Sequence, residues 1–122
     1  MSTYLKLWRT ILVLGFAAVV IAIPTSTPAH TDDPLYVAPT GNDSNTCTSP
    51  GAPCATINGA IGKASPGDTI YVAIGTYTGT GDQVVLLDRD VTLSGGWDTS
   101  FTTQSGTSII DGQETRLGIM IY

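Results

Sequence analysis

The sequence contains a single histidine, His30, and only five basic residues against ten acidic ones. A Ser/His/Asp triad is excluded within the fold, because His30 is expected to lie in a polar spacer before the first strand. The excess of acid repels phosphate and anionic lipid, which argues against nucleic acid or a membrane surface as a partner. Long apolar runs are also scarce. The longest, from Ile11 to Ile23, falls short of the roughly 20 residues that span a bilayer.

The first 29 residues have the order of a secretory signal peptide. A basic start without acids precedes the apolar run, and Thr27-Pro28-Ala29 provides a cleavage site of small residues. A membrane anchor is the alternative interpretation, and the short apolar run argues against it. We expect export to the medium or the cell surface. Residues 30–34 would then form a flexible spacer, and residues 35–122 a single domain with no membrane contact after cleavage.

Cys47 and Cys54 are the only cysteines, and both lie in the part expected to be exported, where oxidising conditions favour disulfides. A bridge would fasten a loop of Ser, Pro, Gly and Ala residues that has little means of holding itself in place. The alternatives are a pair of free thiols and a metal site, but the metal site lacks further ligands. We therefore expect a disulfide and no metal cofactor.

The loop before these cysteines also admits a calcium interpretation, because Asp43 and Asn45 alternate as oxygen ligands do. An EF-hand would next require an Asp or Asn, a glycine and a later Glu, where this chain has Cys47, Thr48 and Cys54. An ordinary turn rich in Asp and Asn is favoured, and an irregular calcium site is the alternative.

The clearest local pattern lies between residues 56 and 77. Apolar residues recur at helical spacing at Ile57, Ala60, Ile61 and Ala64, and Thr56 can cap the first turn. Two glycines within this helix each cost roughly 1 kcal/mol relative to alanine, so packing must hold it. Its narrow apolar face suits a lid over the end of another structure.

Ser65-Pro66-Gly67-Asp68 is expected to end the helix as a type II turn, with Pro66 at its second position and Gly67 at the third, where φ is positive. Asp68 could be taken for a catalytic acid. A carboxylate beside a Pro-Gly turn more often accepts hydrogen bonds from nearby amides, and this role is favoured. A strand is expected over Thr69–Ala73, after which Gly75-Thr76-Tyr77 would turn the chain away.

Further short β-prone runs follow, each bounded by Gly, Asp, Thr or Ser and none followed by a helix. They cover residues 84–87, 91–94, 108–111 and 118–122. Short strands without crossover helices predict an all-β sandwich, barrel or solenoid. Their consecutive apolar residues favour buried parallel strands.

These segments resemble the N-terminal part of secreted right-handed parallel β-helix proteins of the pectin-lyase-like superfamily. The resemblance rests on YVAPTGNDSN, PCATINGAIGKASPGDTIYVAIGTYTG, VTLSGGWD and SIIDGQ, and it covers residues 35–113. It implies a capping helix whose Ile57 and Ile61 cover apolar rows such as Ile70 and Val72, followed by the first coils. Such a β-helix runs through many coils, so we expect this chain to be a truncated part. Alone, it is expected to aggregate or to unfold without cooperativity.

Two groups of residues are candidates for chemistry. Lyases of this superfamily use calcium-binding aspartates and a basic residue, which Asp88, Arg89 and Asp90 imitate. On an extended strand Arg89 would point away from the two acids, so a solvated turn is favoured over a calcium or substrate contact. Trp97 is a candidate carbohydrate contact, although packing at the coil edge is the more common role of such an aromatic, as it is for the tyrosines.

The sequence therefore predicts a non-catalytic segment of an extracellular β-helix protein used for surface display, adhesion or carbohydrate binding, with polysaccharide as the expected partner. The alternative is the start of a polysaccharide lyase or glycoside hydrolase whose active residues lie beyond Tyr122.

Overall fold

The computed structural model describes residues 18–24 and 31–122. Its elements, in chain order, are β1 (Leu35–Val37), α1 (Ile57–Ile61), β2 (Thr69–Ala73), β3 (Gly75–Tyr77), β4 (Gln83–Leu87), β5 (Thr92–Trp97), β6 (Ser108–Ile110) and β7 (Leu117–Ile121). Residues 18–24 form neither helix nor strand. Most of the expected signal peptide, and His30, lie outside the described residues. Across the ranges described, no helix has the length and apolar character needed to cross a membrane.

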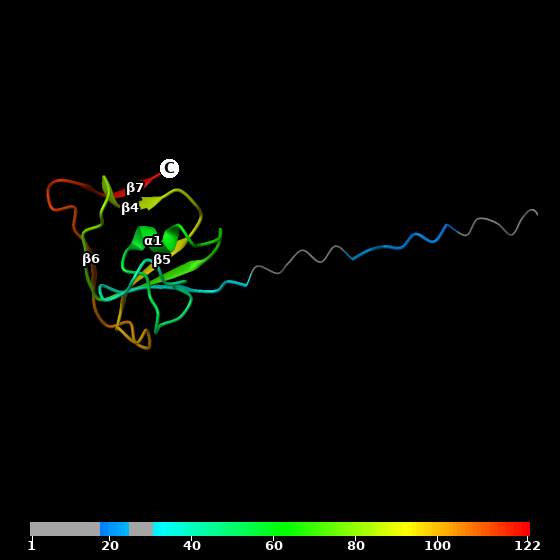
Figure 1. Ribbon diagram of the computed structural model, residues 1–122, viewed down its shortest axis with the longest axis horizontal. Helices are drawn as coiled ribbons and strands as arrows, with labels where there is room; N and C mark the ends of the chain where they lie inside the picture. Colours follow the sequence, from blue (N-terminus) through cyan, green and yellow to red (C-terminus); the bar gives the residue numbers. More distant parts are fainter. Residues whose placement is uncertain (1–17, 25–30) are drawn as a thin grey trace, which may run out of the picture.

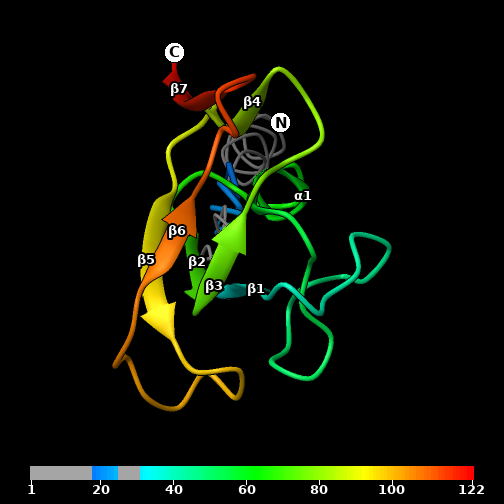
Figure 2. The same ribbon diagram turned by 90° about the vertical axis from the view of Figure 1, so that its left-hand side faces the viewer.

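The strands form three short parallel sheets, with no closed barrel among the described residues, which confirms the all-β class. β2 pairs with β5, β3 with β6, and β4 with β7, so each strand pairs with the one three places further along the chain. β1 adds to the other side of β2. Figure 2 shows β3 and β6 side by side, with β2 and β5 running in the opposite direction.

Alternation along β1 and β2 builds the core. Leu35 and Val37 of β1 are buried together with Ile70 and Val72 of β2, because side chains two residues apart share one face of a strand. Val85 of β4 is also fully buried. The tyrosines that alternate with these residues are half-buried on the outer face.

α1 closes one side of this core. Thr56 caps the helix by accepting a hydrogen bond from the Gly59 amide, 2.9 Å away, and Ile57 and Ile61 are both buried. The helix lies beside β4 (Figure 1), where the Asn58 side chain accepts a hydrogen bond from the Leu86 amide at 2.8 Å. It thus covers apolar side chains and also satisfies a backbone group of a strand.

The expectation for Gly75-Thr76-Tyr77 was wrong: these residues form β3 rather than turning the chain away. β3 has only three residues, and its partner β6 lies far along the sequence, so the pairing leaves no local pattern. Gly75 itself has φ 152° and lies against the ring of Pro39. A local bend and a strand therefore coincide at this position.

The outer edge of β1 is covered by the loop between the two cysteines. The Tyr36 amide donates to the carbonyl of Cys47, and the Cys54 amide donates to the carbonyl of Tyr36, each at 2.8 Å. The Ala38 amide donates to the carbonyl of Cys54 at 2.9 Å. The predicted Cys47–Cys54 disulfide is confirmed, and it holds this covering loop closed.

Candidate carbohydrate-contact surface

A row of aromatic side chains crosses the outer face of the β1–β2–β5 sheet. Tyr36 and Tyr71 are paired across β1 and β2, with ring centroids 5.7 Å apart. The ring of Trp97, at the end of β5, lies 4.7 Å from that of Tyr71. Phe101 packs against Tyr36 from the other side, at 4.9 Å. All four residues remain partly exposed, so the row presents aromatic surface to solvent.

Trp97 is fixed in orientation by polar contacts as well as by stacking. Its indole nitrogen donates to the Ser94 hydroxyl at 3.1 Å, and the Gln104 side chain donates to the Gly95 carbonyl at 2.7 Å nearby. Trp97 was expected to pack, and it was also a candidate carbohydrate contact. The two roles are compatible here, because Trp97 packs against Tyr71 on the outer face of the sheet rather than in the core.

The turn after β5 positions Phe101. The Asp98 carboxylate accepts hydrogen bonds from the amide and hydroxyl of Thr102, at 2.8 and 2.9 Å, and from the Ser100 hydroxyl at 3.1 Å. These bonds, above all the one from the Thr102 amide, hold the pKa of Asp98 below its usual value. The turn they stabilise places Phe101 at φ 56° against Tyr36. The sequence did not indicate this contribution, because Phe101 lies outside any strand pattern.

A cleft of about 210 Å³ lies between α1 and the loop after β3. Its lining combines apolar groups such as Pro39, Ile57 and Val84 with threonine hydroxyls, and it contains no charged or histidine side chain. General acid–base catalysis requires a group that can exchange a proton near neutral pH. The lining of this cleft supplies none.

Residues 88–90 form the solvated turn between β4 and β5 that was favoured for them, and Asp88 and Arg89 come together within it. The two form an ion pair at 3.1 Å within the turn between β4 and β5. The hydrogen bond from Arg89 holds the pKa of Asp88 below its usual value. Arg89 also donates to the Ala64 carbonyl at 3.0 Å, and the carbonyl of Asp90 accepts from the Gly67 amide at 2.7 Å. All three residues therefore stabilise turns next to α1.

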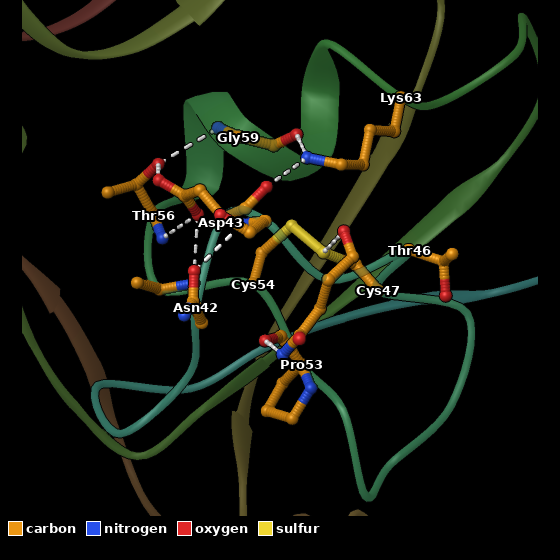
Figure 3. Close-up of a disulfide and its surroundings, with 12 residues drawn as sticks. Asn42, Asp43, Thr46, Cys47, Pro53, Cys54, Thr56, Gly59 and Lys63 are labelled. Carbon is orange, nitrogen blue, oxygen red and sulfur yellow. Dashed lines mark hydrogen bonds between the residues drawn. A yellow bond between two sulfur atoms is a disulfide. The ribbon is translucent and has the colours of Figure 1, made fainter.

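The oxygens of Asp43 are occupied by protein donors. One accepts from the amides of Ala55 and Thr56, both at 2.9 Å, and the other accepts from the Thr56 hydroxyl at 2.8 Å. Lys63 donates to the carbonyls of Asp43 and Gly59 (Figure 3). The amide nitrogen of Asn45 donates to the Pro53 carbonyl at 2.9 Å. The loop that suggested calcium is thus bonded to the start of α1.

Asp68 takes the local role that its turn suggested. One of its oxygens accepts from the Ser65 amide at 2.7 Å, and its own amide donates back to the Ser65 carbonyl at 3.1 Å. Gly67 has φ 97°, as a type II turn with Pro66 at the second position requires. The carboxylate is buried beneath this turn and does not line the cleft between α1 and the loop after β3.

In the described ranges, no three His, Cys, Asp or Glu side chains gather into a group that could hold a metal ion. The fold instead brings four aromatic residues together on one surface, in the row of Tyr36, Tyr71, Trp97 and Phe101. Comparison of the chain with protein-family models, with curated proteins and with solved structures finds no match.

Proposed function

We propose that residues 35–122 form the capped first coils of a secreted right-handed parallel β-helix, a non-catalytic segment used for display and carbohydrate contact. The pairing of each strand with the one three places later supports this, since a chain that winds through three sheets per turn has this pattern. The right hand is the one favoured for connections between parallel strands of one sheet. The covered edge of β1 and the helix α1 would form its cap.

The aromatic row is the observation that carries the carbohydrate part of the proposal. Aromatic rings offer a flat apolar face suited to the C–H face of a sugar, and binding sites combine such faces with a few fixed polar groups. The hydroxyl of Ser94 and the amide of Gln104 lie beside Trp97. With ten acidic residues in the chain, we expect neutral or cationic polysaccharides to bind better than anionic ones.

Affinity electrophoresis with a neutral β-glucan, chitosan and polygalacturonate tests this proposal. We expect the wild-type protein to be retarded by the glucan or by chitosan. Trp97→Leu should abolish the retardation and Trp97→Phe should retain most of it, while the far-UV spectra of both stay unchanged. Because Trp8 lies in the expected signal peptide, Trp97 fluorescence reports binding directly once residues 1–29 are removed. Absence of retardation by all three polysaccharides would refute carbohydrate contact.

The non-catalytic part has its own test. Incubation of the protein with polygalacturonate and calcium should produce no unsaturated uronate, which is followed by its ultraviolet absorbance. Measurable turnover that tracks the purified chain would overturn this part and favour a lyase.

A further inference from the structure

The cleft between α1 and the loop after β3 lies along the edge of β3 that pairs with no strand. Figure 2 shows α1 and β1 on the side of β3 opposite to β6. The lining comes from both sides of the cleft, with Pro39 and Ile57 on one side and residues 76–80 on the other. The cleft is therefore at the capped end of the molecule, away from the outer edges of β6 and β7.

One residue of β3 turns its backbone polar groups away from β6. The Gly75 amide donates to the Thr107 carbonyl at 3.4 Å, and the Tyr77 carbonyl accepts from the Asp111 amide at 3.0 Å. Because the backbone groups of successive residues alternate in direction along a strand, the amide and carbonyl of Thr76 face the opposite edge, where the cleft lies. This edge offers a ligand one donor and one acceptor side by side.

The loop that forms the outer wall of the cleft is held in place. Arg116 donates to the Gly81 carbonyl at 2.8 Å and to the Thr78 carbonyl at 3.3 Å. Gly79 has φ 65°, and a Cβ there would come within 2.8 Å of the Cα of Val84, so the loop packs closely onto β4. The wall is preformed, which lowers the cost of ordering it when a ligand binds.

The lining suits an uncharged ligand with both polar and apolar parts. Burying a charge without a partner is costly, and no charged side chain lines the cleft. Pro39, Ile57 and Val84 supply apolar surface, while Thr78 and Thr80 add hydroxyl groups. The volume of about 210 Å³ would hold about seven water molecules at roughly 30 Å³ each, which is the scale of a single sugar unit.

We propose that the cleft binds the acetamido group of an N-acetylhexosamine unit. The carbonyl of this group would accept from the Thr76 amide, its N–H would donate to a threonine hydroxyl of the lining, and a neighbouring ring hydroxyl would donate to the Thr76 carbonyl. Its methyl group would contact Ile57 and Val84, where a hydroxyl would lose water without gaining a partner. The inference rests on the carbohydrate contact proposed above and narrows the ligand to N-acetylated glycans.

Amide NMR of the full chain titrated with N-acetylglucosamine tests the proposal. We expect shifts of the amide signals of residues 76–80, with a dissociation constant on the order of 1 mM for a ligand of this size. Glucose and glucosamine replace the acetamido group with a hydroxyl or a charged amine, and they should bind at least about tenfold more weakly. Unshifted signals at residues 76–80, or an equal response to glucose, would overturn the proposal. An equal response to N-acetylglycine methylamide, a peptide analogue, would also overturn it, because the sugar ring would then be unnecessary.

Two variants probe the cleft itself. Ala55 lines the cleft and is half-buried, so Ala55→Leu should fill it and abolish the shifts. Ala52→Leu is the matched control, three positions earlier and outside the lining, and should leave binding unchanged. The double variant Thr78→Val and Thr80→Val removes two hydroxyls without adding bulk and should weaken binding about fivefold or more. Unchanged affinity in Ala55→Leu or in the double variant, with a far-UV spectrum like that of the wild type, would contradict the proposal.

A third variant separates the cleft from the aromatic row. Trp97→Leu should lose the retardation by polysaccharide and keep the shifts at residues 76–80. If Trp97→Leu abolishes those shifts as well, N-acetylglucosamine binds on the aromatic row and the cleft proposal is wrong. If no polysaccharide retards the wild type but the shifts persist, the aromatic row has failed its test and the cleft has passed.

Discussion

Gly59 lies beneath the carboxylate of Asp43, so closely that a Cβ at this position would come within 2.6 Å of the carboxylate carbon. Helix propensity alone predicts that Gly59→Ala stabilises the protein by roughly 1 kcal/mol. The substitution would, however, displace a side chain that accepts three hydrogen bonds, each worth about 1 kcal/mol. We therefore expect Gly59→Ala to lower the melting temperature.

Gly62 supplies the matched control for this prediction. It has φ −59°, and a Cβ there would meet nothing closer than the Asn58 carbonyl at 3.4 Å. Gly62→Ala should therefore leave the melting temperature unchanged or raise it. If both substitutions stabilise, the Asp43 contacts contribute little and propensity governs the helix.

Tyr77 provides a second prediction at the scale of one residue. Its hydroxyl is buried and donates to the Ala73 carbonyl at 2.9 Å, and burial raises its pKa from 10.0 to about 12. Because the folded state holds the neutral phenol more tightly, stability is unaffected below pH 10 and falls as pH rises from 10 towards 12. The loss is on the order of 2–3 kcal/mol. Denaturant melts across this range should show the fall, and Tyr77→Phe should abolish most of it.

At the scale of elements, α1 matters because it covers the core without forming a long helix. Ile61 is 3% exposed on its inner face. Ile61→Asp removes that packing and buries a carboxylate, at a cost of about 3 kcal/mol or more. Gly62→Asp places the same charge one position later, where the chain is exposed, and should cost much less. Equal melting temperatures for the two variants would mean that α1 does not seal the core.

Sequence patterns predicted the elements that are determined by residues close together in the chain. The Thr56 cap and the turn at Pro66 and Gly67 could be predicted because their partners lie within a few residues, and the strand that follows could be predicted from its own β-prone residues. β3 could not be predicted, because three residues beginning with glycine form a strand only when β6 lies beside them. The sequence also indicated parallel pairing, through the consecutive apolar residues of Val84–Leu87.

The candidate carbohydrate-contact surface, like β3, depends on contacts between residues far apart in the sequence. Trp97 was identified from its Gly-Gly-Trp-Asp context, but Tyr71 joins it only through strand pairing. Phe101 joins the row at Tyr36, through a turn held by Asp98. The role of Asp43 depends on donors 12 and 13 positions away. Side-chain contacts of this kind have no fixed spacing, so sequence periodicity does not reveal them.

At the scale of the whole molecule, burial is distributed unevenly. The buried apolar residues of the described chain lie between Leu35 and Val85. The apolar side chains of β6 and β7 are half-buried or exposed. Hydrogen exchange should therefore be slowest for amides of β2 and should occur through local opening in β7. Uniform protection across β2 and β7 would contradict this gradient.

The covering loop also makes protection of the β1 edge depend on redox conditions. Reduction of Cys47–Cys54 would remove the covalent closure of this loop and leave three backbone hydrogen bonds, made by Tyr36 and Ala38 with Cys47 and Cys54, to hold it against β1. An uncovered strand edge is a site for pairing with another chain. The redox state of the surroundings would then decide how firmly this edge stays closed to such pairing.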